Sequence, residues 1–353
     1  MRPLQSGVTL HERERANAGY TLFTPMLGTE TLLIDMQGEI VHRWQLPGTP
    51  GGYSRLLPNG NLFYLAKLEG GGPTFKGGAQ GGYLREVDWN GKIVSEYIDP
   101  MQHHDGRKLA NGNIIYTGWE SMPAAHAARV CGGRDMPHPP EGLYSDYVRE
   151  VDAAGKTVWE WHAYDMEIEK YPLNPLVAPQ VFGWCNTVCP LDNGDVLISL
   201  RHINLIAIID RRTRQLKWEI CDMSFGGQHD PQRLANGNIL LFANGLHSYA
   251  MHPHSRILEI DPKNKEIVWS YQANPRTHFF SGHISGQERL PNGNTLICEG
   301  SAGRFFEVTP ARELVWEYVS PHYFPGMDGD SVNWVFRAYR YAKDSVEIAG
   351  RLG

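Results

Sequence analysis

One ten-residue phrase recurs along the chain and limits the folds that the sequence can adopt. Each copy is an apolar run, an Asn-Gly turn and a second apolar run, and the copies cover residues 56–65, 109–118, 191–200, 234–243 and 290–299. Asn-Gly between apolar runs is the strongest short signal for a β-hairpin, because both central residues of a type I′ turn need a positive φ. The sequence therefore predicts five hairpins of one kind.

A second phrase alternates with the first. It is a strand, a polar turn and a strand that ends in an aromatic residue, and its equivalent turn positions are Asp35, Asp88, Asp152, Asp210, Asp261 and Thr309. Two hairpins in each repeat give four antiparallel strands, and such units at a long period are typical of a β-propeller. Six copies therefore predict an all-β, six-bladed β-propeller.

The two ends of the chain indicate how the ring closes. The sixth repeat has no Asn-Gly hairpin after Thr309, but a strand follows at residues 331–341, and an unmatched strand, GYTLFTP, precedes Asp35. We expect the C-terminal strand to complete the N-terminal blade, because closure removes open sheet edges. Residues 1–353 then form a single β-propeller domain, with an N-terminal extension at 1–18 and a C-terminal tail at 342–353. A two-sheet sandwich explains repeated hairpins but not six copies of one unit.

Composition and charge argue against several classes of partner. The net charge of -6 gives no electrostatic attraction to nucleic acid or to an anionic membrane, and no apolar stretch approaches the length of a membrane helix. The five cysteines cannot all pair within the chain, and the first residues show no apolar segment of a signal peptide. We expect a cytoplasmic protein that acts on a small molecule, with a homodimer as well as a monomer left open.

Polar residues recur at a fixed distance before the hairpin turns. Counting back seven residues from each turn Asn gives Gly52, His104, Asn186, His229 and Ser285; two residues further back stand Trp184 and His283, and the incomplete blade offers Asn333. In a propeller the first strand of each blade lines the central channel, so these side chains share one mouth of it. We therefore expect His104, His229 and His283 to converge on a common axis.

Further residues complete this predicted site. Arg201 ends the second strand of its hairpin, and its guanidinium suits an oxyanion such as sulfate, phosphate or carboxylate. The residues expected to line an aromatic substrate are Trp119, Trp184, Phe182 and Tyr249. Asp105 and Asp230 follow two of the histidines, where a carboxylate can orient the backbone or an imidazole, or can cap a turn. Tryptophans repeat in phase at Trp159, Trp218, Trp269 and Trp316, and we interpret them as packing between blades.

These phrases resemble the arylsulfate sulfotransferase-like family, the PAPS-independent β-propeller enzymes. The resemblance covers most of the chain and is most specific in QHD…LANGNILLFANG and NTV…LDNGDVLISLRHINLIAIID. It implies transfer of a sulfuryl group between phenols through a sulfated histidine, without a cofactor. By motif, His229 resembles the nucleophile, His104 the histidine that holds the sulfuryl group, and Arg201 the arginine that steadies the developing charge.

The sequence departs from the family pattern at one position. Asn186 matches the asparagine of the family's H-x-N-S phrase, but this chain reads WCNT, so Trp184 stands where a histidine is expected. An indole cannot protonate a leaving phenolate as an imidazole does. The substitution leaves the proton donor of the reaction unassigned.

Two other functions fit the same residues. Neutral imidazoles at His104, His229 and His283 are also good ligands for Zn²⁺, Mn²⁺ or Fe²⁺, which would make the protein a metal-dependent lyase or hydrolase. A propeller can also bind a partner without any chemistry. The histidines near the channel favour an enzyme over a binding module.

Overall fold

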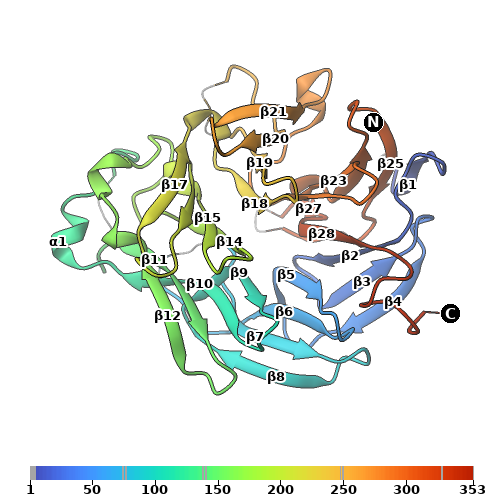
Figure 1. Ribbon diagram of the computed structural model, residues 1–353, viewed down its shortest axis with the longest axis horizontal. Coiled ribbons are helices and arrows are strands. Elements are labelled where there is room, and N and C mark those ends of the chain that lie inside the picture. Colours follow the sequence, from blue (N-terminus) through green and yellow to red (C-terminus); the bar gives the residue numbers. More distant parts are fainter. Residues whose placement is uncertain are drawn as a thin grey trace. The chain divides into compact units, whose positions relative to one another are not determined.

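The structure is a computed structural model, and it describes residues 5–352 apart from 74, 76–77, 137–138, 140, 247, 249 and 327–328. Within these residues nearly every regular element is a β-strand, and the only α-helix is α1 (Ala124–Ala127) (Figure 1). The strands form six sheets of four or five strands and one two-stranded ribbon. The fold is a six-bladed β-propeller, as the repeats predict.

The chain divides into two compact units. The terminal unit contains Met1–Lys67, Leu84–Glu96 and His283–Gly353, and the middle unit contains Leu68–Tyr83 and Tyr97–Gly282. The predicted residues His104, Asn186, Arg201 and His229 all fall in the middle unit. His283 and Asn333 fall in the terminal unit.

In the terminal unit the last strand of the chain completes the first blade. β28 (Val335–Tyr341) pairs antiparallel with β2 (Tyr20–Pro25), which continues to β3 (Glu30–Ile34) and β4 (Ile40–Gln45). The pairing begins at Tyr20 opposite Tyr341. The predicted closure by the C-terminal strand is confirmed.

Two further sheets involve the terminal unit. One follows the order β5 (Pro50–Leu56), β6 (Leu62–Lys67), β7 (Gly82–Val87) and β8 (Ile93–Ile98). The other is β22 (Gly286–Arg289), β23 (Thr295–Glu299), β24 (Arg304–Val308) and β25 (Leu314–Val319). Part of the predicted N-terminal extension, β1 (Gly7–His11), adds a fifth strand beside β25 and covers an edge that would otherwise be open.

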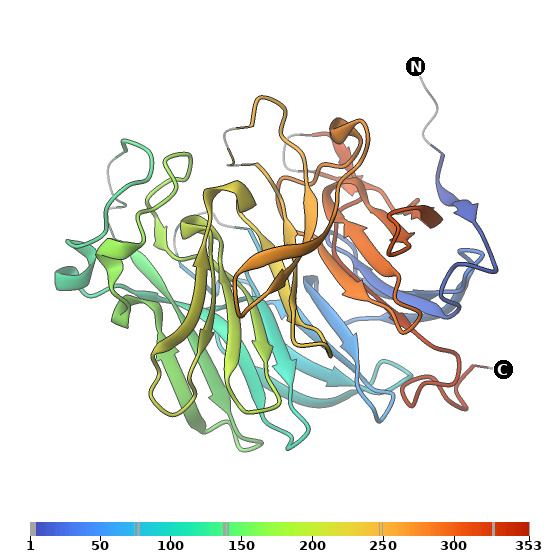
Figure 2. The same ribbon diagram turned by 45° about the horizontal axis from the view of Figure 1, so that its top comes forward.

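The middle unit holds three consecutive blades. Their strands are β9 (Gln102–Lys108), β10 (Ile114–Ser121), β11 (Tyr144–Val151) and β12 (Thr157–His162); β14 (Cys185–Pro190), β15 (Val196–Leu200), β16 (Leu205–Ile209) and β17 (Leu216–Cys221); and β18 (His229–Arg233), β19 (Ile239–Ala243), β20 (Arg256–Asp261) and β21 (Glu266–Tyr271). The first strands of the three blades lie beside one another, with β14 between β9 and β18. In Figure 2 the hairpin turns of this unit lie at the lower ends of the strands, so the candidate residues, which stand at the starts of the first strands, lie at the opposite end.

The Asn-Gly turns differ from the predicted type. Only the glycine has a positive φ, for example 88° at Gly112, and the amide of Gly112 donates to the carbonyl of Leu109 while Leu109 pairs with Asn113. This is a three-residue loop in which a type I turn is followed by a left-handed glycine. The predicted hairpins are present, but the type I′ assignment is wrong because the first Asn uses its side chain to accept from the amide of Asn113 instead.

The in-phase tryptophans join neighbouring blades. The indole N–H of Trp159 donates to the carbonyl of Arg211 at 2.9 Å, and that of Trp218 donates to Pro262 at 2.8 Å. In the terminal unit Trp316 donates to Met36 at 3.0 Å in the same way. Each bond runs from the outer strand of one blade to a turn of the next, and the rings pack against apolar clusters between sheets. The interpretation as blade-to-blade packing is therefore confirmed for these three.

Candidate active site

The first strands of the middle unit bulge where the candidate residues stand. The ladder register shifts between His103 and Gly106 in β9, around Asn186 in β14, and between His229 and Gln232 in β18. His104 has a φ of 48°, Asp230 of 53° and Trp184 of 61°, a left-handed conformation that residues with a side chain rarely adopt. Bulges redirect side chains and occur often beside active sites. Three of them at one end of three adjacent strands mark a candidate site.

His229 is held in one tautomer. Its side chain is buried, and its Nδ1 lies 2.8 Å from Oδ1 of Asn244. The Asn244 amide cannot be reversed without loss, because its Nδ2 donates to the carbonyl of Ser281 at 2.8 Å. Asn244 therefore presents an acceptor, and Nδ1 of His229 must carry the proton. In the neutral ring the lone pair then lies on Nε2.

His104 belongs to a chain of three buried groups that sequence reasoning identified only in part. Its Nδ1 lies 2.7 Å from Nδ1 of His103, and Nε2 of His103 lies 3.1 Å from Oδ1 of Asp146. His103 and Asp146 have no exposed surface, and His104 is 4% exposed. The His103–His104 doublet was a visible signal in the sequence. Asp146 had none, because it lies on the third strand of the blade at no fixed distance from the hairpin turn.

Asn186 ties two blades together. Its Nδ2 donates to the carbonyl of Gln228 at 2.8 Å, and its Oδ1 accepts from Thr187 at 3.2 Å. The amide of Asp230 in turn donates to Oγ1 of Thr187 at 2.9 Å. These bonds fix β14 against the start of β18, next to His229. The predicted substrate-binding residue thus has a structural role that positions its neighbour.

The two carboxylates that follow the histidines bind different kinds of group. Asp105 accepts from the amides of Gly106 and of Val188, each at 3.0 Å, and pairs with Arg107. Asp230 accepts from the side-chain amide Nε2 of Gln232 at 2.9 Å. Of the interpretations left open for Asp105, orientation of the backbone is the one observed, and the bond to Val188 joins β9 to β14.

Arg201 is a cation that none of the described carboxylates neutralises. It begins the turn η3 (Arg201–Ile203), and within the described residues no carboxylate lies at ion-pair distance from it. Burial lowers the pKa of Arg201 to about 10, since charge is disfavoured away from water. A Cβ on Gly227 would lie 3.2 Å from its Nε, so the side chain passes over the residues just before His229. A desolvated guanidinium in this position can bind an oxyanion.

Aromatic rings surround His104. Trp119 is buried and stacks on His103, with ring centroids 4.1 Å apart and planes 19° apart. Trp184 is partly exposed, and its ring lies 5.5 Å from His104, 5.6 Å from Trp119 and 6.0 Å from Phe75. Trp119 therefore packs against His103, whereas Trp184, which stacks on His202 with centroids 4.7 Å apart, keeps part of its surface exposed beside His104.

Other predicted residues lie elsewhere. His283 packs edge-on against Trp334 at 4.9 Å in the terminal unit, where Asn333 donates to the carbonyl of Ser320 at 3.0 Å. Phe182 is fully buried in an apolar cluster, so the expectation that it lines a substrate is wrong. Tyr249 lies outside the described residues.

A metal centre has no support from the described residues. Among them, no group of three or more His, Cys, Asp or Glu side chains lies close enough to hold an ion. The proposed ligands His104 and His229 lie in the middle unit and His283 in the terminal unit.

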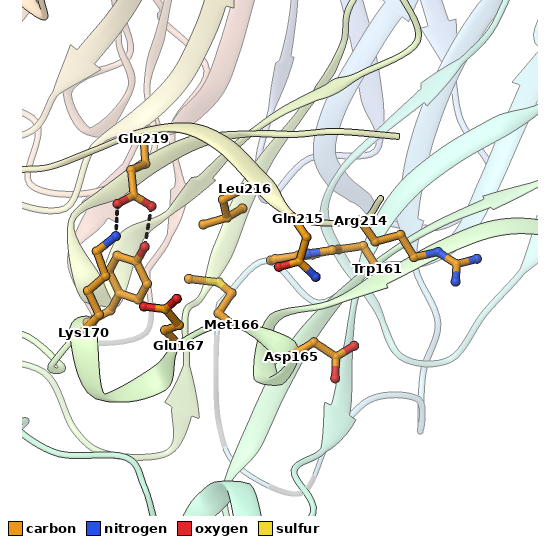
Figure 3. Close-up of a pocket in the computed structure, with 10 residues that line it drawn as sticks. Trp161, Asp165, Met166, Glu167, Lys170, Arg214, Gln215, Leu216 and Glu219 are labelled. Atoms are coloured by element: carbon orange, nitrogen blue, oxygen red, sulfur yellow. Dashed lines mark hydrogen bonds and ion pairs between the residues drawn. The ribbon is translucent and has the colours of Figure 1, made fainter. Parts of the chain in front are cut away.

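A separate small pocket lies on the outer side of the middle unit. It is lined by Trp161, Asp165, Met166, Glu167, Lys170, Tyr171, Arg214, Gln215, Leu216 and Glu219 (Figure 3). Glu219 accepts hydrogen bonds from Lys170 and Tyr171 there. None of the predicted site residues contributes to this pocket, and of its charged groups Lys170 pairs with Glu219.

Comparisons with known proteins identify a family and support the fold. A family profile described as arylsulfotransferase (ASST) matches residues 81–321, more than half of the chain. A protein of unknown function from Bacteroides caccae aligns over 91% of this chain and 98% of its own, with 12% identity and a TM-score of 0.57, which supports the fold alone. Virginiamycin B lyase from Staphylococcus aureus aligns over 90% of this chain and 84% of its own, with 13% identity and a TM-score of 0.46. No curated protein sequence matches the chain. In the described part of the chain, no helix has the length and hydropathy needed to cross a membrane.

Proposed function

Because the chain belongs to the arylsulfotransferase family, we propose that it transfers a sulfuryl group from an aryl sulfate to a phenolic acceptor, with His229 as the nucleophile. The family implies transferase chemistry on aryl compounds. The assignment of His229 is ours and rests on the geometry of the middle unit. The small-molecule donor supplies the sulfuryl group, so we expect no cofactor.

The fixed tautomer of His229 carries this proposal. An imidazole attacks only through a nitrogen that bears a lone pair. The bond from Nδ1 to Asn244, itself held by Ser281, leaves that lone pair on Nε2. A buried ring with one nitrogen anchored loses little orientation entropy on reaction. His229 therefore has the tautomer and the fixed orientation expected of a covalent nucleophile.

The two half-reactions balance on this residue. In the first, the Nε2 lone pair of His229 forms a bond to sulfur, the bond from sulfur to the aryl oxygen breaks, and its electron pair leaves with the phenolate. In the second, the oxygen of an acceptor phenol bonds to sulfur, and the pair of the N–S bond returns to Nε2. The phenol proton must be given in the first step and taken in the second.

In this proposal, the positive charge of Arg201 offsets the negative charge of the sulfuryl oxygens. Its guanidinium stem passes over Gly227, and the described residues place no carboxylate beside it to neutralise it. Arg201 is partly exposed, and a cation that is already partly desolvated is worth more to a transition state than one in water, since less solvent has to reorganise. We propose that the oxyanions of the donor lie against Arg201 while the aryl ring lies against Trp184.

The test is the mass of the intact protein after reaction with 4-nitrophenyl sulfate and no acceptor. We expect release of one equivalent of nitrophenol and the added mass of one SO₃ group, mapped by peptide analysis to His229. His229→Ala should abolish both signals. His278→Ala, an exposed histidine of η5 (Arg276–His278) in the same unit, is the matched control and should leave them unchanged. A wild-type protein that gains no SO₃, or gains it on another residue, contradicts the proposal.

A further inference from the structure

Asp146, His103 and His104 form a buried line of polar groups that the proposed half-reactions do not yet use: the two imidazoles are hydrogen-bonded, and Asp146 lies at ion-pair distance from His103 without a hydrogen bond of its own among the described residues. The distances are 3.1 Å from Asp146 to His103 and 2.7 Å between the two imidazoles. A carboxylate without exposed surface is costly unless a donor or a cation lies beside it. Within the described residues, the only ion-pair partner of Asp146 is His103.

The chemistry of these groups fixes where the protons lie. An ionised Asp146 accepts only, so Nε2 of His103 carries a proton. When His103 is neutral, its Nδ1 is an acceptor, and Nδ1 of His104 must donate across the 2.7 Å contact. The lone pair of His104 then lies on Nε2. A proton taken up there can be compensated by transfer of the Nδ1 proton to His103, which places the positive charge next to Asp146.

The packing around Asp146 and His103 restrains both side chains. A Cβ on Gly183 would lie 2.5 Å from Oδ2 of Asp146, so the glycine leaves the room that the carboxylate occupies. Trp119 stacks on the other member of the pair, His103, at 4.1 Å. Both restraints limit the movement of the carboxylate and of the imidazole beside it.

We propose that His104, supported by His103 and Asp146, donates and accepts the proton of the phenol oxygen, in place of the histidine that Trp184 replaces. This inference rests on the proposed sulfuryl transfer. The cycle begins with one extra proton on the pair His103–His104, so that Nε2 of His104 is protonated. In the first half-reaction Nε2–H of His104 gives this proton to the departing phenolate, which leaves the lone pair on Nε2. In the second, Nε2 takes the proton of the acceptor phenol, which restores the starting state and balances the cycle. His103 and Asp146 are positioning residues, since neither touches the substrate.

The test compares two donors that differ in their need for a proton. Nitrophenolate leaves readily without protonation, whereas the phenolate of phenyl sulfate is far more basic. General acid catalysis contributes about 10²- to 10⁴-fold where the proton is needed. We expect Asp146→Asn and His104→Gln to lose about 100-fold or more in the first half-reaction with phenyl sulfate and less than about 10-fold with 4-nitrophenyl sulfate.

The possible outcomes distinguish a failure of this inference from a failure of the proposed sulfuryl transfer. Equal losses with both donors would overturn the acid–base role and leave His229 as nucleophile untouched. A wild-type protein that forms no sulfuryl-enzyme with either donor refutes the proposed function itself. Asp99→Asn is the matched control, because Asp99 is also a buried carboxylate of the middle unit but binds Tyr116, Tyr147 and Arg149; we expect no dependence on the donor. Should Asp146→Asn fail to fold, His104→Gln carries the comparison.

Discussion

Replacing Asn244 by Asp puts a carboxylate where His229 now meets a neutral amide oxygen, 2.8 Å from Nδ1. The Nδ1 proton still has an acceptor, so the ring keeps its orientation. The new negative charge, however, favours the imidazolium over the neutral ring. Since only the neutral ring is a nucleophile, the substitution should inhibit the first half-reaction at low pH and spare it at high pH.

The size of the effect follows from the distance. An opposite charge within about 4–6 Å shifts a pKa by about 1–3 units, and here it raises the pKa of His229. At any pH below both pKa values, the neutral fraction falls about tenfold for each unit. The rate of sulfuryl-enzyme formation should therefore drop by about 10- to 1000-fold on the acid side, with full recovery above the raised pKa.

The assay is a single-turnover burst of nitrophenol from about pH 5 to about pH 10, with each sample quenched in alkali so that all nitrophenol is read as phenolate. Asn244→Leu is the companion variant. It removes the acceptor without adding charge, so its rate should be low at every pH. An Asn244→Asp profile that runs parallel to that of the wild type would show that His229 does not react as a neutral ring held by residue 244.

Two further predictions follow from the same contacts. Arg201→Ala should raise the KM for the aryl sulfate and slow the first half-reaction. In the wild type, affinity for the sulfate donor should fall as the pH rises through about 10, because the guanidinium of Arg201 then loses its charge. Steady-state kinetics and inhibition by sulfate measure both effects. Trp159→Phe removes the indole N–H that donates to Arg211 and should lower the free energy of unfolding by about 1–3 kcal/mol in urea titrations. Val158→Ala, at a 47% exposed neighbour, should change it by less than about 0.5 kcal/mol.

The fold could be predicted because it repeats. Each Asp phrase predicts one turn, and in the structure Asp35, Asp88 and Asp152 each accept from two backbone amides of that turn. Six such turns and a spare strand at each end suffice for six blades and their closure. The turn type was wrong because the Asn-Gly signal is shared by two-residue and three-residue loops, and only backbone angles distinguish them.

The site could be predicted only as far as counting from the turns allows. That count found His104, Asn186 and His229, but a bulge shifts the pairing by one residue between blades. His103 faces Thr117 in β10, whereas His229, one residue nearer its own turn, faces the equivalent position in β19. The role of His103 was therefore hidden beside its neighbour. No spacing rule reaches Asp146 on a third strand.

The pairing of β28 with β2 has a consequence for biosynthesis. About 290 residues separate the end of β4 from the start of β28, and a ribosome adds roughly 5–20 residues per second, so the first blade waits about 15–60 seconds for its missing strand. During that interval one side of β2 offers unsatisfied amides and carbonyls to any extended polypeptide nearby. Translation that stalls before residue 335 would leave a fragment whose open sheet edge favours aggregation. Cells that express such truncated chains should accumulate them bound to chaperones or in inclusion bodies.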